Sequence, residues 1–285
     1  MNLLFIVKIL SFIPRPIQKC IGYSFLGTKL VKWFKSSDSK TAFDIDNGLR
    51  IYLELSNPLT WDLVLGKDIE KNVKEEFSQN INVGDTIIDV GAHIGEYTLL
   101  GAKLTGTKGS IIAIEPDHEI VKSLKENIKL NGFENCVVFE KAIGEKVETK
   151  NLYKISEADV YGYLDPAVEN KKLKKHSEIE VTTIDEIVLS NNLNTINLLK
   201  IDVEGFEHEV LLGCKNVLEQ NKIKKIIIEL HPQYLEAKGK NEELIYTFLH
   251  KHGFKTKKIQ EKITAGVSST VRVNTKTVNL LALKD

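Results

Sequence analysis

Two apolar stretches in the second half of the chain end in side chains that could carry acid–base chemistry. Asp202 and Glu204 follow one stretch, and Glu229 and His231 close the next. If the two stretches form neighbouring strands, the four side chains lie together at the carboxyl edge of a sheet. A histidine beside carboxylates suits general-base catalysis near neutral pH. The same group could bind a divalent ion, but no HxxxH-like spacing is present, so no metal is predicted.

A glycine-containing loop follows an earlier apolar stretch. It reads Asp89, Val90, Gly91, Ala92, His93, Ile94, Gly95, Glu96. A dinucleotide fingerprint would need glycines at positions 91, 93 and 96, and only the first is present. Asp89 and Glu96 would also repel a diphosphate at the start of the following helix. These carboxylates favour a ligand with a cationic centre and an ammonium group, such as S-adenosylmethionine, although they could simply cap the helix.

Glu115 ends another apolar stretch and is followed by Pro116 and Asp117. A carboxylate at a strand end can accept hydrogen bonds from both hydroxyls of a ribose. A glutamate in this place could equally cap the next helix. The neighbouring loop that starts at Asp89 favours the ribose role.

Five apolar runs alternate with helical patterns and predict the fold. They are residues 86–90, 110–115, 136–140, 197–202 and 225–230. Helices are expected to start near Gly95 and Glu119, and one over 206–219 is expected to join the last two runs. This alternation predicts a doubly wound, Rossmann-like parallel α/β sheet. The remaining elements are a helix at 241–251 and strands at 254–259 and 277–283.

Two segments depart from this alternation. Residues 145–183 are polar, contain a basic cluster, and are predicted to form a long irregular loop. Residues 41–55 contain Asp46, Asn47 and Gly48 between apolar runs, which predicts a short hairpin.

The N-terminal segment is apolar and then amphipathic. Residues 1–13 are too few to span a membrane, which takes about 20. Residues 17–35 combine lysines with Trp33 and Phe34. They could form a helix in a membrane interface, or pack on the domain or a second subunit. We therefore expect N-terminal helices over 1–35, a cap region over 36–80 and the α/β domain over 81–285.

The composition narrows the function classes. The 285 residues include 39 Lys+Arg and 39 Asp+Glu, for a net charge of zero. A chain without excess positive charge is not expected to bind nucleic acid. Cys20, Cys136 and Cys214 are too widely spaced for a disulfide framework, which favours a reducing, cytoplasmic compartment.

Several segments resemble the FkbM-type methyltransferases. They are DVGAHIGEYT (89–98), AIEPD (113–117), VTTIDEI (181–187), LKIDVEGFEHEVLLG (199–213) and IIIELH (226–231). The resemblance extends over about residues 80–254. It implies a class I S-adenosylmethionine-dependent methyltransferase with a seven-stranded sheet whose last strand is antiparallel.

The resemblance also implies roles for the candidate residues. Asp89, Gly91, Ala92 and Gly95 would line the methionine part of the cofactor, Glu115 the ribose and Glu140 to Ala142 the adenine, with Asp202 and Glu204 facing the methyl group and the acceptor. His93, Glu96 and Pro116 are further cofactor-binding candidates. The family more often has Asn at position 93 and an aromatic residue at position 96, so the polar contacts of this loop differ here.

The resemblance implies an O-methyltransferase acting on a sugar or small-molecule hydroxyl. A hydroxyl needs a base as its proton leaves, and Asp202 or His231 is expected to fill that role. The expected partner is a small-molecule or glycan acceptor, with peripheral membrane contact through residues 1–35 as a further expectation. The alternatives are a non-catalytic cofactor-binding module anchored by its N-terminal helices, and a NAD-dependent oxidoreductase.

Overall fold

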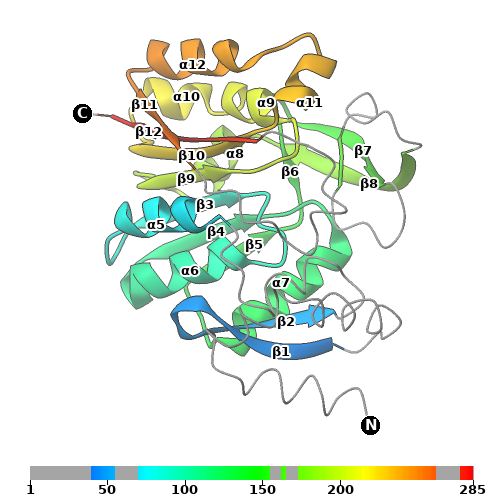
Figure 1. Ribbon diagram of the computed structural model, residues 1–285, viewed down its shortest axis with the longest axis vertical. Coiled ribbons are helices and arrows are strands. Elements are labelled where there is room, and N and C mark those ends of the chain that lie inside the picture. The colour runs from blue at the N-terminus through cyan, green and yellow to red at the C-terminus, as the bar shows by residue number, and fades with distance from the viewer. Residues whose placement is uncertain (1–39, 55–69, 155–161, 165–172, 261–276, 285) are drawn as a thin grey trace. The chain divides into compact units, whose positions relative to one another are not determined.

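A computed structural model of the protein describes residues 40–54, 70–154, 162–164, 173–260 and 277–284 (Figure 1). The chain divides into two compact units, residues 1–71 with 261–274 and residues 72–260 with 275–285. The helices predicted over 1–35 lie outside the described residues, as does Cys20. Among the helices that the structure describes, none is long and apolar enough to cross a membrane.

The first unit contains a β-hairpin. Strands β1 (Lys40–Ile45) and β2 (Leu49–Glu54) pair antiparallel and are joined by a short 3-10 turn, Asp46–Gly48. Asn47 and Gly48 both have positive φ, at 64° and 65°. Asparagine and glycine tolerate this conformation best, which confirms the hairpin that the Asp-Asn-Gly sequence predicted.

The second unit is built on a seven-stranded sheet (Figure 1). In spatial order its strands are β11 (Lys255–Ile259), β12 (Val278–Leu283), β10 (Lys225–Leu230), β9 (Leu198–Ile201), β3 (Thr86–Val90), β4 (Ser110–Ile114) and β5 (Cys136–Phe139). β12 is antiparallel to both of its neighbours, and the strands from β10 to β5 are parallel. The predicted Rossmann-like sheet with an antiparallel last strand is confirmed.

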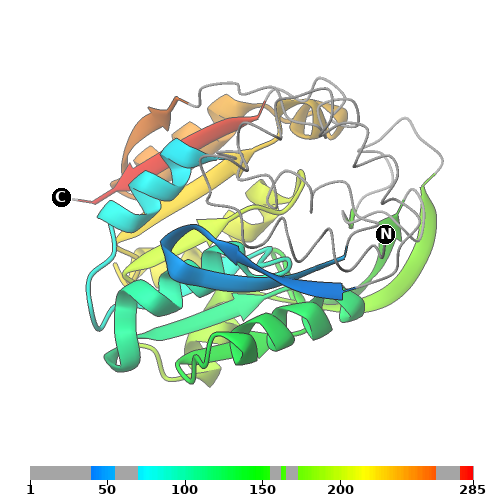
Figure 2. The same cartoon turned by 60° about the horizontal axis from the view of Figure 1, so that its bottom comes forward.

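Helices cover both faces of this sheet because the central strands are apolar on both sides. Those of the second unit are α5 (Lys71–Gln79), α6 (Glu96–Thr105), α7 (His118–Leu130), α8 (Ile184–Ser190), α9 (Glu207–Leu212), α10 (Lys215–Glu219), α11 (Pro232–Ala237) and α12 (Glu242–Lys251). On one face, Ile87 and Ile111 approach Gly101 of α6 so closely that an added β-carbon would lie 3.3 and 3.2 Å from them. Figure 2 shows α6 and α7 side by side on this face.

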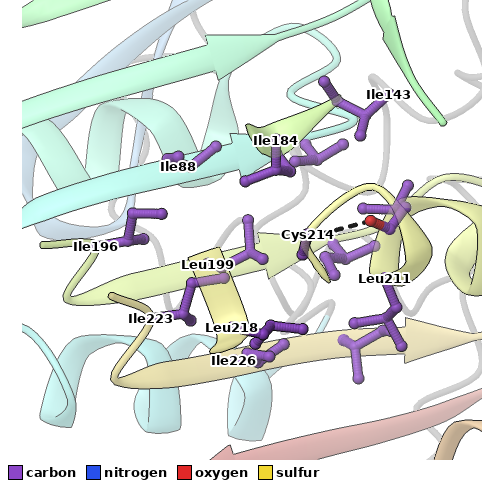
Figure 3. Close-up of a cluster of buried hydrophobic side chains, with 14 of the residues drawn as sticks. Ile88, Ile143, Ile184, Ile196, Leu199, Leu211, Cys214, Leu218, Ile223 and Ile226 are labelled. Atoms are coloured by element: carbon purple, nitrogen blue, oxygen red, sulfur yellow. Dashed lines mark hydrogen bonds between the residues drawn. The ribbon is translucent and has the colours of Figure 1, made fainter. Parts of the chain in front are cut away.

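The opposite face carries an extensive apolar core. Ile88 of β3 and Leu199 of β9 pack there with residues of α8, α9, α10 and α12, including Ile184 and Leu211 (Figure 3). Each of these four side chains is fully buried. The core therefore fixes the strands whose ends carry the candidate site residues.

The helix predicted over 206–219 is two helices, α9 and α10, with a break at Gly213 and Cys214. A β-carbon on Gly213 would lie 2.1 Å from the carbonyl oxygen of Gly144, so the backbones approach too closely for any other residue. Val210, Leu211, Cys214 and Val217 of this segment are buried, and Cys214 donates a hydrogen bond to the Val210 carbonyl (Figure 3).

The prediction of an irregular loop over 145–183 is wrong for the residues that the structure describes. β6 (Ala142–Ile143), β7 (Glu148–Lys154) and β8 (Lys174–Thr182) form a three-stranded sheet in the order β6-β8-β7. Ile179 and Val181 are buried whereas Glu180 between them is exposed. A strand covered on one face alternates polar and apolar residues, and the many lysines and glutamates concealed this alternation.

Candidate active site

The strand order places the candidate residues on one edge of the sheet. From β3, strands β4 and β5 extend to one side and β9 and β10 to the other. Because all five strands are parallel, their carboxyl ends meet at the same edge. The edge beside β3, where the order reverses, is the usual ligand site of open α/β sheets.

The loop after β3 depends on its glycines. Gly91 has φ +81°, and a β-carbon there would lie 1.8 Å from the carbonyl oxygen of Asp202. Gly95 has φ +102°, and a β-carbon there would lie 2.6 Å from Cδ1 of Leu124. Gly91 and Ala92 both donate backbone hydrogen bonds to the carbonyl of Ile114. The loop thus turns tightly over β4, with Gly91 packed against the Asp202 backbone and Gly95 against Leu124.

Asp89 lies beneath this loop and is 1% exposed. Its Oδ2 accepts a hydrogen bond of 2.6 Å from the hydroxyl of Thr98, but its Oδ1 has no hydrogen-bond partner among the described residues. Burial raises the pKa of Asp89, although Lys200 and Thr98 oppose the shift. A buried acceptor without a donor fits a ligand that brings one, such as an ammonium group.

Glu115 follows β4 and organises the adjoining backbone. Its Oε2 accepts a hydrogen bond from the His93 amide and its Oε1 one from the Asp117 amide, both at 3.0 Å, across the turn that contains Pro116. Burial raises the pKa of Glu115 to about 7. Each carboxylate oxygen keeps a second lone pair. Those lone pairs suit the two hydroxyls of a ribose.

The other cofactor candidates have partners within the protein. Glu96 forms an ion pair with Lys74 of α5, so its charge is shared. Glu140, after β5, is exposed and pairs with His118 at 2.8 Å. Ala142 is buried in β6. These contacts place the residues on the same edge of the sheet, and their roles toward a cofactor stay predictions.

The structure brings the four predicted acid–base residues together because β9 and β10 are direct neighbours. His231 Nε2 lies 3.2 Å from Oε2 of Glu204 and 4.0 Å from Oε1 of Glu229. Lys200 Nζ donates a hydrogen bond of 3.1 Å to Oδ2 of Asp202. Lys200 also lies 4.3 Å from the ring centroid of Tyr97, which holds the ammonium group in place.

The charges around His231 set its protonation. Burial alone would lower the pKa of His231, but Glu204, Glu207 and Glu229 together raise it well above 6.5. Asp202 shows the opposite balance, because Lys200 and His231 outweigh its burial and lower its pKa. At neutral pH the arrangement therefore favours an imidazolium at His231 near an ionised Asp202.

The same side chains are also close enough to share a cation. Asp202, Glu204 and His231 each offer one donor atom, and these atoms lie within 4.8 Å of one another. Oxygen and imidazole donors of this kind suit several divalent metals. The expectation that the protein uses no metal stays a prediction.

Sequence reasoning missed Glu207 and the pair of Lys154 with Asp117. Glu207 is fully buried, and its Oε1 lies 2.9 Å from Nδ1 of His231. Lys154 of β7 is buried against Asp117, which caps α7 through the amides of Glu119 and Ile120. Glu207 stands five residues after Asp202 in the same acidic segment, a signal that was available. Lys154 could not be found, because its strand was not predicted.

Residues 89–256, more than half of the chain, match the model of the methyltransferase FkbM domain. The chain belongs to the FkbM methyltransferase family. The matched region starts at Asp89 in β3, contains all four acid–base residues, and ends in β11.

Two curated relatives are similar to part of this chain. The hexuronic acid methyltransferase AglP of Haloferax volcanii is 28% identical over 174 residues, which are 60% of this chain and 64% of AglP. The AMB antimetabolite synthetase AmbE of Pseudomonas aeruginosa is 22% identical over 213 residues, 63% of this chain and 10% of AmbE. The match therefore spans less than two thirds of either relative.

Solved structures with a similar fold include the FkbM methyltransferase of Methylobacillus flagellatus. It has a TM-score of 0.48 and 16% identity, and the match covers 78% of this chain and 54% of that one. A Streptococcus mutans protein solved in complex with SAH has a TM-score of 0.47 and 10% identity, and the match covers 75% of this chain and 97% of that one.

The FkbM family and the geometry together indicate S-adenosylmethionine as the cofactor. Oδ1 of Asp89, which has no hydrogen-bond partner among the described residues, fits its ammonium group, and the spare lone pairs of Glu115 fit its ribose. A nicotinamide cofactor fits less well, since the loop has His93 and Glu96 where a dinucleotide fingerprint needs glycines. The family match also decides against the NAD-dependent oxidoreductase.

Proposed function

We propose that this FkbM protein is an S-adenosylmethionine-dependent O-methyltransferase that acts on a hydroxyl of a sugar or another small molecule. The close approach of Gly91 to the Asp202 carbonyl carries the proposal. It joins the loop that fits the cofactor to the loop that holds the acid–base residues. A methyl donor and an acceptor held on these two loops would meet beside β3.

Different residues of the chain are assigned to the cofactor and to the acceptor. When bound, S-adenosylmethionine supplies a methyl group on a positively charged sulfur. Asp89 and Glu115 are the buried acceptors for its ammonium and ribose groups. Methyl transfer is a displacement in line with the departing group, so the main task of the protein is to align the acceptor. Asp202 and Glu204 stand where that alignment is needed.

Deprotonation of the acceptor involves Asp202 and His231. Asp202 is ionised at neutral pH because Lys200 and His231 lower its pKa, so it can accept a hydrogen bond from the hydroxyl. His231 is the stronger base, but it can accept a proton only after losing one, at a pH above its raised pKa. The hydroxyl has a single hydrogen. We therefore assign its hydrogen bond with Asp202 to the resting complex, which orients the hydroxyl, and acceptance of the same proton to the deprotonated Nε2 of His231 as the O–CH₃ bond forms.

The acceptor class rests on the relative AglP, which is named a hexuronic acid methyltransferase. A uronic acid or a glycan that contains one is therefore the first substrate to test. Contact of residues 1–35 with a membrane surface is a separate proposal, motivated by their lysines beside Trp33 and Phe34. Flotation with liposomes, with and without those residues, tests it, and equal flotation would refute it.

The function is tested by incubating the purified chain with isotope-labelled S-adenosylmethionine and a panel of uronic acids, neutral sugars and glycosides. The expected result is one labelled methyl group on a hydroxyl oxygen, located by mass spectrometry and NMR. Label on nitrogen or carbon, or none on any acceptor despite cofactor binding, would contradict O-methylation of a sugar.

A further inference from the structure

Glu207 is a fully buried carboxylate behind His231. Its Oε1 accepts a hydrogen bond of 2.8 Å from the Gly205 amide and lies 2.9 Å from Nδ1 of His231. Its Oε2 is buried without a hydrogen-bond partner among the described residues. A carboxylate is costly to bury in this way unless its interactions have a use. Binding of the acceptor does not explain Glu207, because it sits on the interior side of the imidazole.

The face of the His231 imidazole ring is also in contact with the protein. It stacks on the ring of Tyr234, with the centroids 5.5 Å apart and an angle of 17° between the planes. Tyr234 in turn makes an edge contact with Tyr163. A β-carbon on Gly205 would lie 2.5 Å from Cβ of Tyr234, so the backbone closes against this stack. The ring therefore cannot turn without disturbing several contacts.

The carboxylates around His231 divide between its two ring nitrogens. Glu204 and Glu229 are paired with Nε2, at 3.2 and 4.0 Å. Among the described residues, only Glu207 is paired with Nδ1. The two nitrogens thus have different surroundings: Nε2 faces the partly exposed Glu204 and Glu229, and Nδ1 faces the fully buried Glu207.

We infer that Glu207 is a positioning residue for the transfer. It keeps the proton on Nδ1 of His231, so that Nε2 is the nitrogen that exchanges a proton with the acceptor hydroxyl. A carboxylate only accepts, so Glu207 favours hydrogen on Nδ1 and Glu204 favours hydrogen on Nε2. The contact of Glu207 is the shorter, 2.9 against 3.2 Å, and its side chain is fully buried whereas that of Glu204 is 22% exposed. Solvent therefore screens Glu204 more, and the neutral imidazole keeps its hydrogen on Nδ1. The same logic orients the histidine of hydrolase triads. This inference rests on the proposed function, in which Nε2 faces the acceptor.

The tautomer of His231 can be tested in the wild-type protein without an activity assay. Long-range ¹H–¹⁵N spectra of histidine-labelled protein, with His231 assigned from the missing signal in His231→Gln, report which nitrogen carries hydrogen. At the alkaline end of the stable range, we expect a protonated Nδ1 and an unprotonated Nε2. Hydrogen on Nε2, or rapid exchange between both tautomers, would overturn the inference. The result does not depend on finding the acceptor, so a failure of the proposed function remains distinguishable.

Kinetics then test whether Glu207 acts through His231. Glu207→Gln keeps the shape but offers a donor to Nδ1, and we expect kcat to fall about 100-fold with unchanged affinity for S-adenosylhomocysteine. The same exchange at exposed Glu236 of α11 serves as the control and should change neither value. In a His231→Gln background, Glu207→Gln should cause no further loss of kcat. A full additional loss would contradict the inference, and if Glu207→Gln does not fold, the tautomer measurement decides.

Discussion

Gly91 and Asp202 touch through their backbones: a β-carbon on Gly91 would lie 1.8 Å from the Asp202 carbonyl oxygen. Gly91 opens the loop after β3, and Asp202 opens the loop after β9, the strand next to it. The Asp202 amide also donates a hydrogen bond of 3.0 Å to the carbonyl of Val90. The two loops that we assign to cofactor and acceptor are therefore fixed to each other, and a side chain at position 91 would displace both.

Gly91→Ala is expected to destabilise the fold by about 2–4 kcal/mol, within the range of severe point mutations. It should also weaken binding of S-adenosylhomocysteine at least about tenfold. Gly84→Ala is the matched control, because Gly84 has φ +90° but nothing within 4 Å of an added β-carbon. Gly84→Ala should lower the free energy of unfolding only through backbone strain, on the order of 1 kcal/mol. Equal losses in denaturant unfolding of the two variants would show that the contact with Asp202 is unimportant.

Asp202→Asn is expected to abolish turnover while leaving the affinity for S-adenosylhomocysteine largely intact. The amide has nearly the same shape but cannot take the ionised role beside the acceptor hydroxyl. It also leaves buried Lys200 without its ion pair, which should lower the free energy of unfolding by roughly 1–3 kcal/mol. Calorimetry and a methyl-transfer assay on one preparation measure both effects. Normal turnover in the variant would remove Asp202 from the mechanism.

The sequence predicted the sheet and the residues along its edge for a definite physical reason. Strands buried on both faces, such as Ile87-Ile88 in β3, are almost entirely apolar and are easily recognised. Residues that directly follow such strands, including Asp202 and His231, are then placed by topology alone. Their convergence needed only that β9 and β10 be neighbours, which the structure provides.

Other features depend on contacts between distant segments and could not be predicted. The break at Gly213 arises because the Gly144 carbonyl approaches it from another part of the chain. β7 and β8 contain many exposed polar residues and no continuous apolar run, a pattern that in the sequence is typical of a loop. The pairing of Glu207 with Nδ1 of His231 requires the three-dimensional position of both residues.

The rate of methyl transfer should rise with pH through the raised pKa of His231. Burial lowers that pKa, but Glu204, Glu207 and Glu229 raise it further, so the residue stays protonated well above pH 6.5. Nε2 becomes a proton acceptor only as the pH passes this value. Rates at saturating cofactor and acceptor should rise in the wild type and stay low and flat in His231→Gln. The same pH profile in both proteins would show that a group other than His231 accepts the proton of the hydroxyl.

Glu115 should make the protein less stable as the pH rises from about 4.5 to about 7. Burial raises its pKa to about 7 in the folded protein, whereas the unfolded chain loses the proton near the usual value of 4.5. Between these values the unfolded state releases a proton that the folded state keeps. The stabilisation is therefore complete below the lower value and lost above the higher one, a change on the order of 3 kcal/mol.

Denaturant unfolding of Glu115→Gln against wild type measures this effect. The difference in unfolding free energy should shift in favour of the variant as the pH rises, and then level off above about pH 7. Glu134→Gln, at an exposed position, should show no such trend. A difference that does not vary with pH would mean that folding does not raise the pKa of Glu115.

The central claim is that the edge of the sheet between the Gly91 loop and Asp202 binds S-adenosylmethionine. Calorimetric titration of the full chain with S-adenosylhomocysteine, and separately with NADH, tests it most directly. We predict micromolar binding of S-adenosylhomocysteine, weakened in Asp89→Asn and Glu115→Gln, and no binding of NADH. Binding of NADH in its place, or binding of S-adenosylhomocysteine that neither substitution weakens, would contradict the account.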